Sequence, residues 1–173
     1  MRYLYLLLFL LLISLAGCSS ASLSDAIDKD GRINVEILFQ DDIDKVVLFL
    51  NEDYSGQPML SLNTFTKEDS RYAYNAGGEF AQNVDITNHF EIIKVTPVGH
   101  SSIIALWGGV FNYPNATTVS YVLKDDEDNE IYSSKVKITD NIVYEKLPDG
   151  IYEQAKSFHY KILDEKNNVI VEW

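Results

Sequence analysis

Apolar and polar residues alternate along most of this chain, as they do in β-strands that bury one face. The clearest example begins at residue 33, where every second residue is apolar: Ile33, Val35, Ile37 and Phe39. This spacing predicts a strand with these side chains on one buried face. Residues 46–50 are instead continuously apolar, which predicts a strand buried on both faces.

Further segments are rich in β-branched and aromatic residues and are separated by turn-forming residues. They are residues 59–65, 72–74, 90–95, 103–107, 119–123, 131–138, 142–147, 158–163 and 169–173. No stretch of similar length has the spacing of an amphipathic helix, although a turn of helix fits residues 23–29. Short strands at regular intervals predict an all-β fold, either a sandwich or a barrel.

The first 17 residues have the layout of an export signal. Arg2 gives a positive start, residues 3–13 are apolar, and small residues follow them. The apolar run is shorter than the about 20 residues that a membrane-spanning helix needs, so an uncleaved membrane anchor is the weaker alternative. We therefore expect residues 1–17 to be a signal peptide that is removed.

The sequence Leu15-Ala16-Gly17-Cys18 directly follows this apolar stretch and resembles the lipobox of bacterial lipoproteins. The resemblance implies cleavage between Gly17 and Cys18, and attachment of a diacylglyceryl group to the Cys18 sulfur. The alternative is an ordinary secretory signal with a chance cysteine. However, Cys18 is the single cysteine of the chain, and it occupies the position that the motif requires.

Lipidation at Cys18 would hold the mature chain on a membrane of the cell envelope, because two or three acyl chains anchor a protein stably. By resemblance to lipoprotein sorting, Ser19 implies the outer membrane in a Gram-negative cell. In a Gram-positive cell the protein would lie on the outer face of the cell membrane. A single cysteine also excludes an intrachain disulfide, so we expect the exported part to be stabilised by burial alone.

The chain is strongly acidic, with a formal net charge of −12 at pH 7. This charge argues against nucleic acid as a partner, because phosphate binding needs clustered Lys and Arg. It equally disfavours a body that lies flat on anionic lipid. We interpret the acidic excess as a source of solubility, and no partner follows from it.

Composition divides the mature chain into three parts. Residues 18–31 are mostly small and polar, and we expect a tether that could reach about 40 Å from the lipid. Residues 32–88 are expected to form an N-terminal β-rich unit, and residues 89–173 a second one. Residues 46–59 also align without gaps on residues 119–132, which indicates either a duplicated sandwich unit or two similar hairpins.

The second unit carries a more specific motif, Leu147-Pro148-Asp149-Gly150-Ile151-Tyr152. It is similar to the corner before strand F in fibronectin type III and other immunoglobulin-like domains. The resemblance implies an immunoglobulin-like β-sandwich, with the Tyr152 hydroxyl bonded to nearby backbone and Trp107 in the core. Strands A, B, C, C′ or D, E, F and G would be residues 90–96, 102–111, 118–123, 131–138, 142–147, 158–163 and 169–173.

One acidic turn, residues 124–130, is a candidate calcium site, because Ca²⁺ needs six to eight oxygen ligands. Asp126 and Asp128 lie in this turn, and the predicted topology places Asp149 at the same end of the sandwich. The alternative is a solvated hairpin tip. The histidines His89, His100 and His159 share no metal-ligand spacing, and we expect no cofactor. 

Aromatic residues make up 12% of the chain, including 11 tyrosines. Flat rings bind sugars and proteins with little loss of entropy, although strands also favour tyrosine. Tyr72 and Tyr74 alternate along one segment, and Tyr113 precedes a proline in a predicted loop. These tyrosines are therefore candidate ligand contacts.

The sequence favours a lipid-anchored, non-catalytic binding or scaffold module that engages an envelope protein or a glycan. One alternative is an envelope hydrolase whose active site is assembled from distant strands. Another is an inhibitor or exclusion lipoprotein acting against lysozyme or phage. A pocket in which acid, base and nucleophile converge would favour the hydrolase, and a packed core with shallow grooves would favour the binding module.

Overall fold

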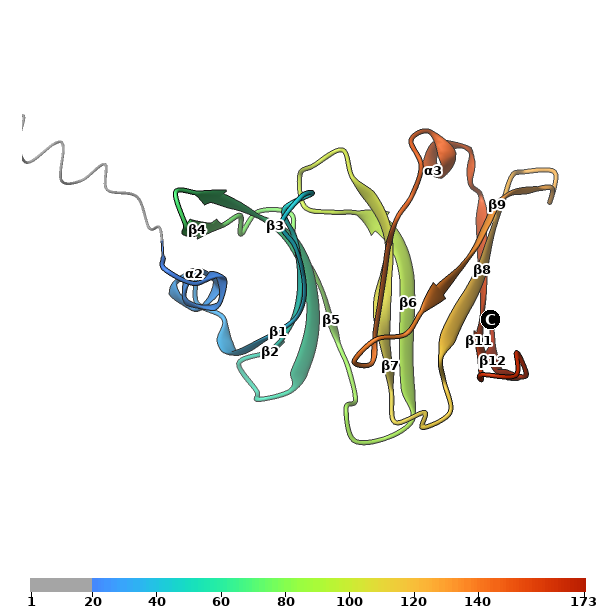
Figure 1. The fold of residues 1–173 in the computed structure, drawn as a ribbon, viewed down its shortest axis with the longest axis horizontal. Coiled ribbons are helices and arrows are strands. Elements are labelled where there is room, and N and C mark those ends of the chain that lie inside the picture. Colours follow the sequence, from blue (N-terminus) through green and yellow to red (C-terminus); the bar gives the residue numbers. More distant parts are fainter. Residues whose placement is uncertain (1–19) are drawn as a thin grey trace, which may run out of the picture.

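The computed structural model describes residues 20–173, so the predicted signal peptide and Cys18 lie outside the described residues. Strands dominate the described part, and all the strand pairings in it are antiparallel (Figure 1). Its elements are α2 (Leu23–Lys29), β1 (Ile33–Asp41), β2 (Val46–Glu52), β3 (Pro58–Glu68), β4 (Arg71–Tyr74), β5 (Phe80–Asn83), β6 (Phe90–Pro97), β7 (Ile104–Phe111), β8 (Thr118–Lys124), β9 (Glu130–Lys137), β10 (Ile142–Lys146), α3 (Ile151–Gln154), β11 (Ser157–Leu163) and β12 (Val169–Glu172). The all-β prediction is confirmed.

The strands form three sheets that stack as layers (Figure 1). The first sheet has the order β1-β2-β3-β4, and β5 also pairs with β3. The middle sheet has the order β10-β7-β6, and the third sheet has the order β12-β11-β8-β9. The first sheet comes from residues before 84 and the others from residues after 89, so the sheets divide where the two units were predicted to meet.

The first core lies between the first and middle sheets. Val46, Leu48, Leu60 and Leu62 of the first sheet pack against Trp107 and its neighbours on the middle sheet. Trp107 is 1% exposed, and its indole N–H donates to Thr96 Oγ1 at 2.9 Å. The predicted core tryptophan is therefore buried, but it faces the first sheet and not the third.

The second core lies between the middle and third sheets, where Leu106 and Val110 of β7 meet Val119 and Ile162. Successive β7 residues point to opposite faces, so β7 supplies side chains to both cores. A Cβ at Gly108 would lie 1.9 Å from the Ile92 carbonyl oxygen, which shows how closely β6 and β7 approach. The middle sheet is thus covered on both faces.

Residues 20–31 do not form the predicted tether. Ser22 caps α2 by accepting from the Asp25 N–H at 3.1 Å, and the helix buries Leu23 and Ile27 against the outer face of the first sheet. Ser20 is itself 2% exposed and pairs with Tyr72 of β4. The tether prediction for residues 18–31 is wrong over this stretch, because Leu23, Ala26 and Ile27 lie on one face of a short helix and are buried there.

Strand β1 does not keep its apolar residues on one face. Val35 and Ile37 pack in the cluster beneath α2, whereas Phe39 packs in the core between the first and middle sheets. The β1–β2 register shifts between Ile37 and Phe39. An extra residue at such a bulge reverses the face on which later side chains lie. The one-face prediction for β1 is therefore wrong, while the prediction that residues 46–50 are buried from both sides is confirmed.

Three hairpin turns share one construction, beginning at Asp53, Asp125 and Asp164. In each, the carboxylate accepts backbone N–H groups two and four residues later, at 2.8 to 2.9 Å. The residue three positions later has a positive φ: Gly56, Asp128 and Asn167. Two of these turns lie in the aligned segments 46–59 and 119–132, and the third lies outside them. Shared turn chemistry therefore accounts for the turn residues of the alignment.

These turns predict acid sensitivity. Hydrogen bonds from the Asn168 side chain and backbone hold the pKa of Asp164 below its usual value. Its stabilising effect is present above the unfolded pKa of about 3.9 and is lost as pH falls through the folded pKa. Asp164→Ala should therefore lower the urea midpoint at pH 7, and the difference from the unmodified protein should shrink below about pH 4. A difference that is constant from pH 7 to pH 2 would contradict this.

A second prediction concerns Tyr144 of β10, which stacks on Phe39 with ring centroids 4.5 Å apart. Its hydroxyl is buried without a hydrogen-bond partner among residues 20–173. Tyr144→Phe keeps the ring and removes this unsatisfied group, so the free energy of unfolding should stay equal or rise by about 1 kcal/mol. The matched control is Tyr121→Phe, which removes a hydroxyl that donates to Glu145 at 2.6 Å and should destabilise in urea unfolding. Equal losses in both variants would refute the prediction.

Candidate functional site

Cys18, the predicted lipidation site, lies outside the described residues, but the other predicted site residues can be placed. Tyr72 packs against Phe65, and the Lys67 ammonium lies 5.0 Å from the centre of its ring. Tyr74 packs edge-on against Phe49. Both tyrosines thus pack on the cluster beneath α2, and neither ring is an open platform.

Tyr113 lies elsewhere, in the loop between β7 and β8. It stacks on His89 with ring centroids 4.8 Å apart, and its hydroxyl donates to Glu91. Burial and this hydrogen bond raise the pKa of Tyr113 to about 12. Glu91 also accepts from the indole N–H of Trp173 at 3.1 Å, so Tyr113 belongs to a contact that joins β6 to the end of β12. 

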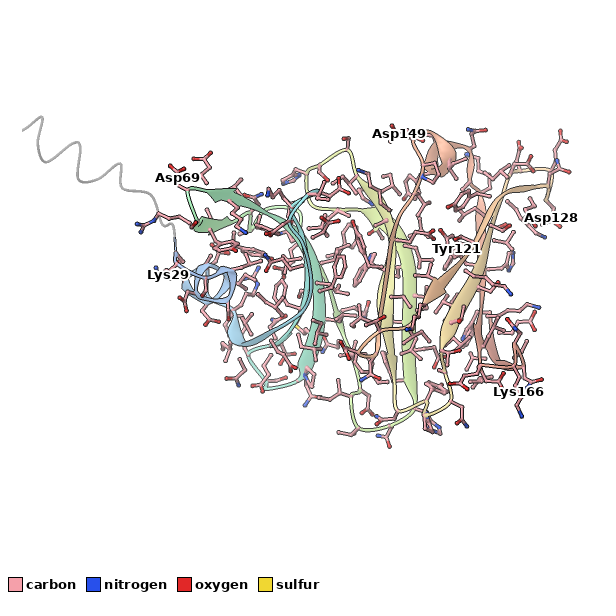
Figure 2. All side chains as sticks on the ribbon, in the orientation of Figure 1. Lys29, Asp69, Tyr121, Asp128, Asp149 and Lys166 are labelled. Carbon is pink, nitrogen blue, oxygen red and sulfur yellow. The ribbon has the colours of Figure 1, made fainter. Side chains whose placement is uncertain are left out.

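The candidate calcium ligands are not brought together. Asp128 lies at the tip of the β8–β9 hairpin, where Lys124 donates to its carboxylate at 2.9 Å. Asp149 lies on a different loop, beside α3 (Figure 2). Within residues 20–173, no three His, Cys, Asp or Glu side chains are grouped so that they could hold a metal ion. The Asp126, Asp128 and Asp149 set therefore forms no site in this structure.

Likewise, Tyr152 does not form the predicted corner. It lies on α3 with 38% of its surface exposed, and its hydroxyl has no hydrogen bond among the described residues. The motif's leucine, Leu147, is buried in the second core. The Pro148-Asp149-Gly150 turn leads into a helical turn, which carries Tyr152 outward before β11 begins.

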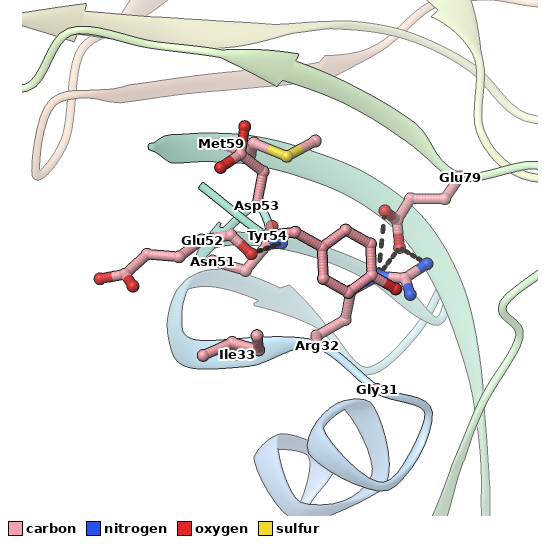
Figure 3. A pocket seen from close by; sticks show the side chains of 9 residues that line it. All are labelled: Gly31, Arg32, Ile33, Asn51, Glu52, Asp53, Tyr54, Met59 and Glu79. Atoms are coloured by element: carbon pink, nitrogen blue, oxygen red, sulfur yellow. Dashed lines mark hydrogen bonds and ion pairs between the residues drawn. The ribbon is translucent and has the colours of Figure 1, made fainter. Parts of the chain in front are cut away.

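A pocket of about 350 Å³ opens at one end of the first sheet (Figure 3). It is lined by three separate segments: residues 31–33 at the start of β1, residues 51–54 with Met59 around the β2–β3 hairpin, and Glu79. Tyr54 stands at the second position of the hairpin turn and is 99% exposed. The pocket therefore combines a fixed polar wall with a free aromatic ring.

The wall of the pocket is an ion pair between Arg32 and Glu79. Arg32 Nε and Nη2 donate to the Glu79 carboxylate at 3.0 to 3.3 Å (Figure 3). The side chain of Glu79 is 10% exposed and that of Arg32 is 27% exposed. Burial disfavours the charge of Arg32, but the hydrogen bonds to Glu79 and the nearby negative charges, Glu79 first among them, together outweigh that effect and raise the pKa of Arg32.

Further buried polar groups support the Arg32–Glu79 ion pair on the side away from the pocket opening. The Tyr74 hydroxyl donates to Glu79, and the Ser61 hydroxyl donates to Asn51 Oδ1 at 2.9 Å. Burial and the bond to Glu79 raise the pKa of Tyr74, so its hydroxyl stays protonated as a donor. Asn51 and Ser61 are buried polar residues whose cost is offset by these bonds. The network preorganises the pocket wall.

A fork in the first sheet brings Glu79 to Arg32. Strand β3 pairs with β5 through residues 59–62 and with β4 through residues 65–68. Asn63, between these stretches, is fully buried and donates to the Asn75 carbonyl and to the Tyr74 hydroxyl. It thereby holds the loop of residues 75–79 against the sheet. Sequence reasoning missed this site, because β5 was not predicted and Arg32 and Glu79 are far apart in the chain.

Comparison with known proteins adds no family: no family model, curated protein or solved structure matches this chain. Among residues 20–173, no helix is both long and apolar enough to cross a membrane. The candidate site is therefore interpreted from the residues that form it.

The network predicts a measurable loss when Glu79 is removed. Glu79→Ala leaves Arg32 and Tyr74 without their acceptor, and unfolding free energy should fall by about 2 kcal/mol. This is less than for a fully buried pair, because Arg32 retains solvent contact. In urea unfolding, the double variant Arg32→Met/Glu79→Met should be more stable than Glu79→Ala. If the loss of unfolding free energy in the double variant equals the sum of the losses in Arg32→Met and Glu79→Met alone, the two side chains are not coupled and the prediction is wrong.

Proposed function

We propose that this chain is a lipid-anchored, non-catalytic binding or scaffold module of a bacterial cell envelope, engaging an envelope protein or a glycan. The observation that carries the proposal is the docking of Ser20. Its backbone N–H donates to the Tyr72 carbonyl at 2.7 Å, and its carbonyl accepts from the Tyr72 N–H at 2.8 Å. The lipobox cysteine lies two residues before this bridge.

Chain geometry then limits the distance between anchor and body. Two residues span at most about 7 Å, so a lipid on Cys18 would hold the Ser20 end of the body against the bilayer. The side chain of Lys29 also donates to Ser20 Oγ at 2.9 Å, which strengthens the attachment of this end. Because the link between Cys18 and the folded body would be this short, the body would have a defined orientation at the membrane. Such an orientation suits a scaffold or a receptor for an envelope partner.

The order of the three sheets determines which end of the body would face the membrane. The helix α2 and the Ser20 end lie at one end of the long axis, and the third sheet lies at the other (Figure 1). An anchor at Cys18 would therefore place the first sheet next to the membrane and the third sheet away from it. The membrane would be the outer membrane in a Gram-negative cell, or the outer face of the cell membrane in a Gram-positive cell.

We further propose that residues 89–173 form an immunoglobulin-like β-sandwich. Support comes from the order of the strands: β10-β7-β6 packed on β12-β11-β8-β9 corresponds to E-B-A packed on G-F-C-C′. The residues of this unit depart from the family pattern at Trp107 and Tyr152, as described above. Since this fold hosts many unrelated functions, the proposed function depends on the anchor and the pocket.

The test of the anchor uses the full chain in its own cells. Cys18→Ser should move the protein from the membrane fraction to the soluble fraction, whereas Ser19→Ala should leave it with the membrane. The orientation is tested in vesicles with the purified lipidated protein. A fluorophore at Glu68→Cys should be quenched by headgroup nitroxides, and one at Lys166→Cys, on the far side in Figure 2, should not.

A matched insertion distinguishes docking from simple attachment. Ten Gly and Ser residues between Ser19 and Ser20 should keep the protein in the membrane fraction but remove the difference in quenching between the two labelled positions. Membrane association of Cys18→Ser would overturn the anchor. Equal quenching without the insertion would overturn the proposed orientation.

A further inference from the structure

We infer that the pocket between Arg32, Asn51 and Tyr54 is a binding site for a neutral saccharide. The inference deepens the proposed function, because it assigns a ligand class and a site to the binding module, and it does not depend on where the chain is anchored. It rests on unused hydrogen-bonding groups, an exposed aromatic ring, and the charge of the pocket lining.

The pocket presents both donors and acceptors that the fold leaves unused. Arg32 Nη1 has one weak contact, to the Asp30 carbonyl at 3.5 Å, and Asn51 Nδ2 has one, to the Glu52 carbonyl at 3.4 Å. Glu52 also lines the pocket, and its carboxylate is a hydrogen-bond acceptor. A hydroxyl group donates and accepts, so a polyhydroxylated ligand satisfies such a mixed set.

Apolar surface accompanies these polar groups. The Tyr54 ring is fully available to solvent, and Ile33, at 44% exposure, and Met59 also line the pocket. Pyranose rings have an apolar face formed by C–H groups as well as a polar rim, so they can stack on an aromatic ring while hydrogen-bonding at the edge. The backbone beneath Tyr54 is fixed by the Asp53 carboxylate, which accepts from Ser55 and Gln57.

Charge then limits which polar ligands can bind. Arg32 is neutralised by Glu79, and the remaining charged residues of the lining are Glu52 and Asp53, both acidic. An anionic ligand such as a phosphate or a uronic acid would meet two uncompensated carboxylates. A volume of about 350 Å³ is at the lower end for small-molecule pockets, which suits one or two sugar rings.

The polar wall is preorganised, which lowers the cost of binding. Glu79 is held by Arg32 and Tyr74, and Asn51 is held by Ser61. These side chains therefore lose little further freedom when a ligand arrives. Tyr54 is the exception, because its free ring must be ordered over the ligand.

The test is calorimetric titration of the full-length protein, purified from its own cells in detergent micelles. The neutral probes are chitobiose and cellobiose, the anionic probe is digalacturonic acid, and the cationic probe is trilysine. At least one neutral disaccharide should bind saturably and digalacturonic acid should not. Tyr54→Ala should weaken binding about tenfold, which corresponds to about 1.4 kcal/mol of lost stacking. The matched control is Tyr152→Ala, which removes a partly exposed tyrosine from α3.

Three outcomes overturn the inference: no saturable binding of either neutral disaccharide, equal affinity of the Tyr54→Ala and Tyr152→Ala proteins, or saturable binding of trilysine alone. Membrane fractionation of Tyr54→Ala should match that of the unmodified protein. Failure of saccharide binding would thus leave the anchor proposal intact, and failure of the anchor would leave saccharide binding measurable.

Discussion

The middle sheet is buried on both faces, and the rest of the structure depends on this constraint. Three strands, β10, β7 and β6, must supply side chains to two cores at once. Trp107 and Phe111 serve the core toward the first sheet, and Leu106 and Val110 serve the core toward the third. Because the middle sheet needs both covers, the N-terminal unit is part of the same packed body as the C-terminal one. Removing either cover would expose a continuous apolar face.

Much of the fold follows from sequence periodicity. Strands such as β2 and β8 were predicted because their apolar side chains are continuous or strictly alternating, and burial enforces those patterns. The bulge in β1 could not be predicted, because one inserted residue changes the facing of later side chains without changing composition. The docking of α2 was missed for a similar reason, since Leu23, Ala26 and Ile27 are too few to distinguish a packed helix from a polar linker.

The candidate site was beyond sequence reasoning for a different reason. Arg32 is an ordinary charged residue in the sequence. Its ion pair with Glu79 forms only because β3 pairs with β5 and with β4 through different residues, which places Glu79 beside it. The predicted tyrosines illustrate the converse. Tyr74 was selected as a surface contact, yet its hydroxyl lies behind the pocket wall and supports Glu79. A single signal was present in the sequence: Tyr54 is an aromatic residue in a polar turn, where no packing requirement explains it.

The bridge between Ser20 and Tyr72 has a mechanical consequence for a chain anchored at Cys18. A force applied to such an anchor would act first on the two backbone hydrogen bonds between Ser20 and Tyr72 and then on the short helix α2. These contacts would yield one after another, before the continuous pairing of β1 with β2 is strained. Peeling residues 20–32 from the first sheet would extend the link by up to about 40 Å while both cores stay closed. The docked segment would thus serve as a force-dependent extension, short at rest and long under tension.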